Sequence, residues 1–317
     1  AIINFHLNDE EKINPLSFTF TKEQMPENNK SGAVYQGHFL CLPRWGAPSE
    51  GEIKADIPNH GQFANILWQS SPQSNPLQLQ MDADAALESM YVNRTITLSK
   101  HSAVFEVKEI ITNAATLGRL YNMVQHPTLA APFLNNLIII NCNATKGFQQ
   151  FSDYNKTINY PVVQTGNLSI NLTSPITPCN SVFSFIVNKN DVWGWITTYS
   201  AEYKLLFGYV WKREQYPWIH LWQHFEENKI KYLGLEFGTA GIHQPFKKIL
   251  EGGIVMFDTK TVDYIDAGEK ISRDYICFLY KASEEIKSIM KVELSKTNND
   301  IIIYYNDDKQ LNLSVSF

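Results

Sequence analysis

The sequence lacks most of the features that would assign a function at once. Its four cysteines, Cys41, Cys142, Cys179 and Cys277, form no C-x-x-C pair, so neither a zinc knuckle nor a dithiol redox motif is present. No run is rich in Lys or Arg, and the net charge of −5 argues against nucleic acid or an anionic membrane as a partner. The sequence motifs of nucleotide-binding loops, zinc proteases and serine esterases are absent too. These absences remove the commonest nucleotide-binding, zinc-protease and esterase functions.

Long apolar runs are missing as well. Residues 137–140 are typical of the longest, and they are of strand length, far too short to cross a bilayer. We expect a soluble, cytoplasmic protein, or a periplasmic one if the start at Ala1 reflects removal of a signal peptide.

What the sequence does contain is typical of a folded protein with many aromatic side chains. At 317 residues, the chain could form one large all-β domain or two smaller ones, and 44% apolar with 19% charged residues argues against disorder. Aromatic residues make up 13% of the chain. Aromatic side chains beyond the needs of a core commonly bind flat ligands such as sugars, although they also occupy ordinary β positions.

Short alternating runs with turn residues about every ten positions indicate strands. Between Tyr91 and Asn113, a period of two around the turn at residues 99–102 predicts a β-hairpin. Residues 49–57 read as a polar loop, and no stretch has a convincing helical period, although residues 283–289 could form a short helix. The pattern predicts an all-β sandwich or barrel of unusual size, which we take as one domain over residues 1–317 with residues 1–30 as an N-terminal wrapping segment.

His126 is the first candidate for chemistry. It lies next to Gln125 and before a proline, in an apolar stretch at residues 121–134. A partly buried imidazole held in this way is a natural proton donor or acceptor, although a single His in an apolar run is more often a core residue.

Two loops and one late strand add further candidates. Arg44 and Trp45, between two prolines, offer a forked donor and a flat ring that suit a polyol, or else form a surface stack; His60 before a glycine could face a pocket. Glu236 alternates with apolar neighbours on a predicted strand, where a carboxylate would have a raised pKa and could act as a general base, or could point outward. His220 and His224 would share one face of a helix as metal ligands do, but their surroundings indicate strand or loop.

Taken in order, these landmarks resemble those of the aldose 1-epimerases, or galactose mutarotase-like proteins. The resemblance extends over roughly residues 35–280 and includes Arg44-Trp45-Gly46, His60-Gly61, the Arg94 hairpin, Gln125-His126-Pro127, the aromatic cluster at residues 216–222, residues 234–239 and Gly268-Glu269. The fuller His-x-Tyr-Phe-Asn motif of the family is replaced here by residues 126–129, so the chain resembles a divergent branch.

The resemblance implies a large β-supersandwich and a mutarotase that needs no metal or cofactor. In that family a His is the general acid and a Glu the general base, which by position correspond to His126 and Glu236. The residues predicted to bind substrate are Arg44, His60, Gln125, Arg213, Trp218 and Trp222. The expected ligand is a monosaccharide or a sugar phosphate, and the expected state is a monomer or weak dimer. A non-catalytic carbohydrate-binding protein, and an accessory domain of a polysaccharide lyase or glycosidase, stay open as alternatives.

Overall fold

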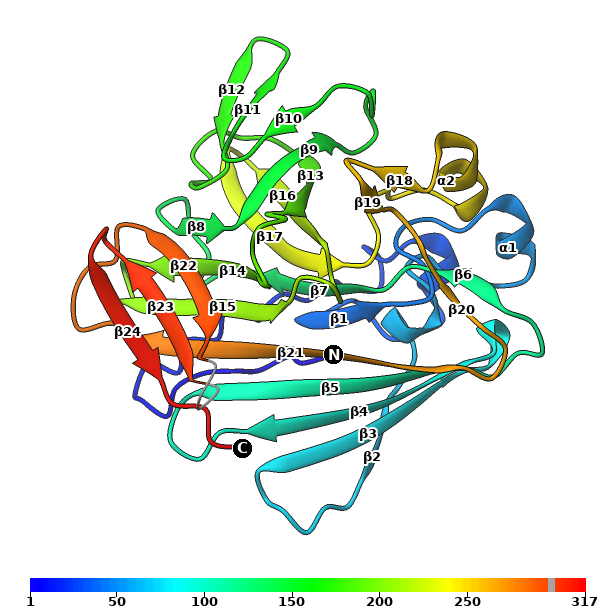
Figure 1. Cartoon of the computed structure of the whole chain (residues 1–317), viewed down its shortest axis with the longest axis horizontal. Helices are drawn as coiled ribbons and strands as arrows, with labels where there is room; N and C mark the ends of the chain where they lie inside the picture. The colour runs from blue at the N-terminus through cyan, green and yellow to red at the C-terminus, as the bar shows by residue number, and fades with distance from the viewer. Residues whose placement is uncertain (296–299) are drawn as a thin grey trace.

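Two large antiparallel sheets dominate the computed structural model, which describes residues 1–295 and 300–317 (Figure 1). The first has the strand order β1 (His38–Cys41), β7 (Val124–Leu129), β17 (Lys229–Gly238), β16 (Trp218–Glu226), β13 (Ser181–Val187), β9 (Ala144–Gln149) and β10 (Ile158–Asn159). The second has the order β2 (Gln69–Ser71), β3 (Gln78–Ala85), β4 (Met90–Leu98), β5 (Val104–Asn113), β21 (Lys270–Lys281), β15 (Leu205–Lys212), β14 (Trp193–Ser200) and β8 (Ile139–Cys142).

Smaller elements decorate the sandwich. Two-stranded pairs are formed by β11 (Val162–Thr165) with β12 (Leu168–Asn171), β18 (Val255–Met256) with β19 (Thr259–Lys260), and β20 (Asp263–Ile265) with β6 (Arg119–Tyr121). A three-stranded sheet contains β22 (Ile289–Leu294), β23 (Ile301–Tyr305) and β24 (Lys309–Leu313). The α-helices of the described residues are α1 (Glu50–Lys54) and α2 (Phe246–Gly252), and none is long and apolar enough to cross a membrane.

The main core lies between the two large sheets because alternate residues of each strand point inward. In β17, Leu235 and Phe237 join this core, together with Leu221 of β16. They pack against inward residues of the second sheet, such as Val107 of β5 and Phe207 of β15. The intervening residues of β16 and β17 are thereby left on the other face of the first sheet.

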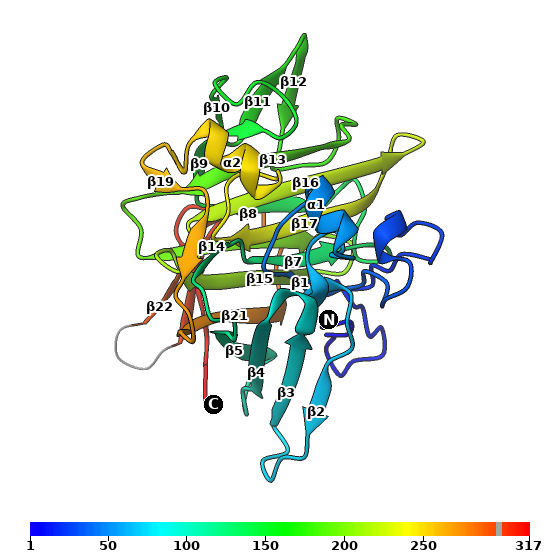
Figure 2. The same ribbon diagram turned by 90° about the vertical axis from the view of Figure 1, so that its right-hand side faces the viewer.

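The C-terminal sheet forms a third layer. Ile289, Val292 and Ile303 pack against Leu206 and Phe278, which lie on the outer face of the second large sheet. Figure 2 shows this sheet on the side of β21 and β15, away from β1 and β7. The C-terminal sheet therefore covers the outer face of β14, β15 and β21. It does not cover the face of the first sheet that carries the candidate residues.

The predicted all-β class is confirmed, and so is the hairpin, which is formed by β4 and β5 around the predicted turn. Two local predictions were wrong. Residues 283–288 are not helical, because Ile286 is buried in the core under the C-terminal sheet while the Lys287 backbone N–H binds the side chain of Asn306. Residues 49–57 are not only a loop, because Ser49 begins α1 with a capping box to Glu52.

Candidate functional site

A cavity of about 230 Å³ opens on the face of the first sheet that points away from the main core. Its floor holds Phe39 of β1, His126 of β7, Glu236 of β17 and Trp222 of β16. These strands are neighbours, with Phe39 opposite His126 in the register and Glu236 opposite His220. Strand pairing therefore brings residues almost 200 positions apart to one place.

His126 and Glu236 touch. The imidazole Nε2 lies 3.2 Å from Glu236 Oε1, and the other carboxyl oxygen accepts a hydrogen bond from the indole Nε1 of Trp45 at 2.9 Å. On its far side, His126 Nδ1 is 2.9 Å from the hydroxyl of Thr128. Phe39 stacks on the imidazole with ring centroids 4.2 Å apart. The side chains of His126 and Glu236 are thus surrounded by protein atoms except where they face the cavity.

Burial keeps this pair neutral. Removal from water raises the pKa of Glu236 to about 8, against a smaller lowering by the Trp45 hydrogen bond, and it lowers the pKa of His126 to about 3. The Thr128 hydroxyl can donate to the His126 carbonyl, which lets Thr128 Oγ1 accept from Nδ1–H and leaves Nε2 as an acceptor. At neutral pH the shared proton therefore lies mainly on Glu236 and points at His126.

The loop between β1 and η2 (Gln62–Ala64) forms one wall and supplies Trp45 and His60. Its two limbs are tied together: His60 N–H donates to the Gly46 carbonyl at 3.0 Å, and Gly46 N–H donates to His60 Nδ1 at 3.1 Å. Because Nδ1 accepts, the proton of this imidazole is on Nε2, where it can serve as a donor. Gly46 has a φ of 105°, and a Cβ there would lie 2.8 Å from the ring of His243, so only glycine fits.

The N-terminal segment forms the opposite wall. Phe18, Phe20 and Pro26 line the cavity together with Tyr35. Phe18 lies edge-on to Trp222 with centroids 6.2 Å apart, and the Phe20 N–H donates to the Tyr35 carbonyl at 2.9 Å. The ligand space is therefore closed by a segment that contributes no strand to either large sheet.

Several histidines surround the site, and those that are buried are held neutral. Burial is the first cause of a pKa below the ordinary value in each of the four buried histidines, which are His38, His60, His126 and His220. His243, which sequence reasoning missed, lies 5.5 Å from His60 between ring centroids and also lines the cavity. Its signal was the same as that of His60, a histidine beside a glycine-rich turn.

Of the predicted residues, His60, His126, Trp222 and Glu236 meet in the cavity, and the others do not. The expected convergence was wrong for Arg44, whose guanidinium is buried in an ion pair with Glu52 and lies 3.7 Å from Glu88. Trp218 is buried too, and its indole donates to the Lys260 carbonyl at 2.6 Å.

Gln125 points into the main core because it precedes His126 on the same strand. Its side-chain amide donates to Glu109 at 2.6 Å, and its carbonyl lies 3.0 Å from His38 Nε2. Glu109 in turn accepts from Arg94 at 2.7 Å. Gln125 thus belongs to a polar network between the sheets, directly behind the candidate site.

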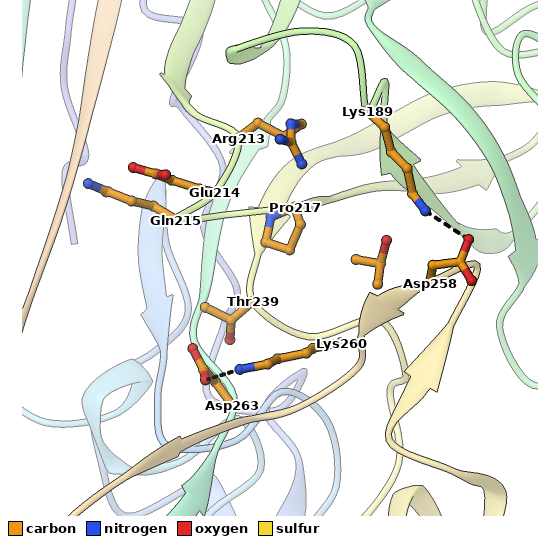
Figure 3. Close-up of a pocket in the computed structure, with 10 residues that line it drawn as sticks. Lys189, Arg213, Glu214, Gln215, Pro217, Thr239, Asp258, Lys260 and Asp263 are labelled. Carbon is orange, nitrogen blue, oxygen red and sulfur yellow. Dashed lines mark hydrogen bonds and ion pairs between the residues drawn. The ribbon is translucent and has the colours of Figure 1, made fainter.

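Arg213 lines a different hollow, which Figure 3 shows. This hollow has a volume of about 450 Å³, and its charges are largely paired with one another. Lys189 lies 3.1 Å from Asp258, and Lys260 lies 3.7 Å from Asp263. The predicted convergence of Arg213 with His126 was therefore also wrong.

The described residues contain no group of three His, Cys, Asp or Glu side chains placed to hold a metal ion. His220 and His224 lie on strand β16 rather than on a helix, where a spacing of four residues separates them by about 13 Å along the strand.

Comparison with known proteins gives structural neighbours only. No family model matches the sequence, and no curated protein matches it. The solved structures that it resembles include a galactose mutarotase related enzyme from Lactobacillus acidophilus, with a TM-score of 0.57 and 12% identity over 83% of this chain and 89% of that one. A galactose mutarotase-like protein from Lactobacillus casei gives 0.56 and 10% over 85% and 90% of the two chains.

A protein from Klebsiella pneumoniae, provisionally named an aldose 1-epimerase, gives a TM-score of 0.59 and 14% identity over 84% of this chain and 69% of that one. At identities of 10–14%, these likenesses show the fold and assign no residue roles. The chain therefore has the fold of the galactose mutarotase-like proteins, as a divergent example of it.

Proposed function

We propose that the protein is an aldose 1-epimerase, a mutarotase that interconverts the α and β anomers of a monosaccharide. The observation that carries the proposal is the 3.2 Å contact between His126 Nε2 and Glu236 Oε1 on the floor of the cavity. The fold supports it, because the structural neighbours include galactose mutarotase-like proteins.

The pair holds the one proton that the reaction has to move. Ring opening takes a proton from the C1 hydroxyl, gives a proton to the ring oxygen and breaks the bond between C1 and that oxygen. Both oxygens are bonded to C1, so an acid and a base that lie side by side can reach them together. Rotation about C1–C2 and reclosure with the proton transfers reversed give the other anomer.

Each member of the pair can take either role. With the shared proton on His126, the imidazolium donates to the ring oxygen and the Glu236 carboxylate accepts from the C1 hydroxyl. With the proton on Glu236, the form that burial favours, the carboxyl donates and the neutral imidazole accepts. Trp45 and His60 hold the sugar or the carboxyl in place through Nε1–H and Nε2–H, and the face of Trp222 packs against the ring.

The test is the rate of mutarotation of freshly dissolved aldoses, followed by polarimetry or NMR exchange. We expect His126→Gln and Glu236→Gln each to slow catalysis roughly a hundredfold, and the double variant to be little worse than either, because one proton unit is lost in every case. The matched control is the other His–Glu pair of the fold, His224 and Glu226, which lies 3.4 Å apart outside the cavity. Full activity of both cavity variants would refute the assignment.

A binding protein without turnover is the second candidate. It is favoured by the fact that both carboxyl oxygens of Glu236 already have partners within the protein. It predicts no acceleration of any aldose by the wild type, together with sugar binding that is lost in Trp222→Ala.

A further inference from the structure

The cavity has two chemically different ends. His60, His126, Glu236 and His243 are grouped at one end, with 5.8 Å between the ring centroids of His60 and His126. The other end is built mainly from the side chains of Phe18, Phe20, Pro26, Val182 and Trp222, with Gln24 of the same N-terminal segment beside them. A ligand that fills the space must therefore present hydroxyl groups to one end and carbon to the other.

The apolar end begins directly beside the acid–base pair. The rings of His126 and Trp222 have centroids 5.9 Å apart. Val182 is the cross-strand partner of Trp222 and also lines the cavity, and Phe18 closes over the same indole. If C1 and the ring oxygen lie at the pair with the ring oxygen on the side of Trp222, C6 on C5 falls within reach of these side chains.

The lining also offers no cationic side chain to a negative charge. Glu236, which burial keeps protonated at neutral pH, is the acidic residue among the lining side chains of the described chain, and these include no Lys, Arg or Asp. Arg44, which precedes the lining residue Trp45, forms ion pairs with Glu52 and Glu88 instead. A phosphate or carboxylate on C6 would be transferred from water to a largely aromatic and aliphatic wall without a cationic partner, which is unfavourable for a charged group.

Size adds a further limit. About 230 Å³ is below the range of about 300–1,000 Å³ that is usual for ligand pockets, so we expect the cavity itself to hold one sugar ring. We propose that the natural ligand is a single uncharged 6-deoxyhexose, whose C6 methyl group lies against Val182, Trp222 and Phe18. This inference rests on the proposed function, which gives the position of C1.

The test uses four sugars that differ at C6 alone: D-fucose with a methyl group, D-galactose with a hydroxymethyl group, D-galactose 6-phosphate, and D-galacturonate. We expect kcat/KM for D-fucose to exceed that for D-galactose roughly tenfold or more, the usual discrimination of an apolar wall against one hydroxyl, and to exceed that for the two anions by a hundredfold or more. Equal values for D-fucose and D-galactose, or comparable turnover of the 6-phosphate, would overturn the inference.

One variant tests the wall itself. Val182→Thr keeps the shape but adds a hydroxyl, and it should reduce the preference for D-fucose over D-galactose roughly fivefold or more. Val192→Thr makes the same change at a side chain that is 70% exposed and outside the cavity, and it should leave the ratio unchanged. An unchanged ratio in Val182→Thr would overturn the placement of C6.

Binding separates this inference from the proposed function. If no sugar is turned over, the mutarotase proposal fails, but quenching of tryptophan fluorescence by the same four sugars still measures their affinities through Trp45 and Trp222. Tighter binding of D-fucose by tenfold or more would then support the ligand class. Equal affinities, or no binding by any of the four, would overturn it.

Discussion

Replacing Glu236 by Gln should stabilise the protein while it abolishes most of the activity. The carboxyl is 1% exposed and its pKa is raised from the ordinary value of 4.5 to about 8, so between these values the folded state has to keep a proton that the unfolded chain releases. Gln avoids this penalty, and it can still accept from Trp45 Nε1 and donate to His126 Nε2.

The magnitude follows from linkage. A raised pKa of an acid gives no penalty below pH 4.5, where the carboxyl is protonated in both states, and a growing penalty above it of about 1.4 kcal/mol per pH unit. At pH 7 the penalty is about 3 kcal/mol, and above pH 8, where the folded state also titrates, it levels off at about 5 kcal/mol. Glu236→Gln should therefore match the wild type near pH 4.5 and exceed its free energy of unfolding increasingly from pH 5 to pH 8.

The assay is urea unfolding of both proteins at pH values from 4.5 to 9, with the free energy of unfolding extrapolated to water. Glu10→Gln, at an exposed side chain, controls for the loss of one negative charge. Parallel stability curves for wild type and Glu236→Gln across this range, or a less stable variant at pH 8, would refute a neutral buried carboxyl and with it the neutral pair.

Three further predictions address the pair, the fold and its acid limit. Trp45→Phe removes the hydrogen bond that lowers the pKa of Glu236, so the alkaline limb of the pH–rate profile should move upward from about 8; a profile that stays in place would contradict this. Gly147→Ala should destabilise the fold by about 1–3 kcal/mol because its Cβ would collide with the Ser184 carbonyl, whereas Gly51→Ala, in α1 with open space around it, should be neutral or stabilising by up to about 1 kcal/mol in urea unfolding. Acidification below pH 6.5 should steeply lower the unfolding temperature in calorimetry. Below that pH, histidines of the unfolded chain bind protons, whereas the four buried histidines of the folded state stay neutral because burial lowers their pKa, in His126 to about 3. An unfolding temperature that does not change between pH 6.5 and pH 4 would exclude this.

The placement of Glu236 could be predicted from the sequence because the local pattern constrains it. Glu236 alternates with Leu235 and Phe237, which must enter the main core, so the carboxylate had to lie on the opposite face with few ways to reach water. The same alternation argues against Gln125 as a ligand group, since neighbouring residues of a strand cannot both point at one cavity.

Other residues could not be placed because their partners are set by tertiary structure or by a short helix. Arg44 looked like a free donor, but the carboxylate that binds it comes from Glu52, which the capping box at Ser49 fixes in α1. The sequence signal for that box is present, a Ser three residues before a Glu. For Phe18 there was no such signal, because it lies in an irregular segment whose path depends on what it packs against.

The cavity is lined partly by the first large sheet and partly by the N-terminal segment, and this has a consequence for how its specificity can evolve. The contact between His126 and Glu236 is fixed by the pairing of β7 with β17, and a shift of one residue in either strand would turn one of these side chains into the core. The wall that faces the ligand is built from residues 18–26, which add no strand to the large sheets and whose side chains can be exchanged at little cost to the main core. Selection for a new sugar could therefore act on a few positions near the N-terminus while the chemistry stays where it is.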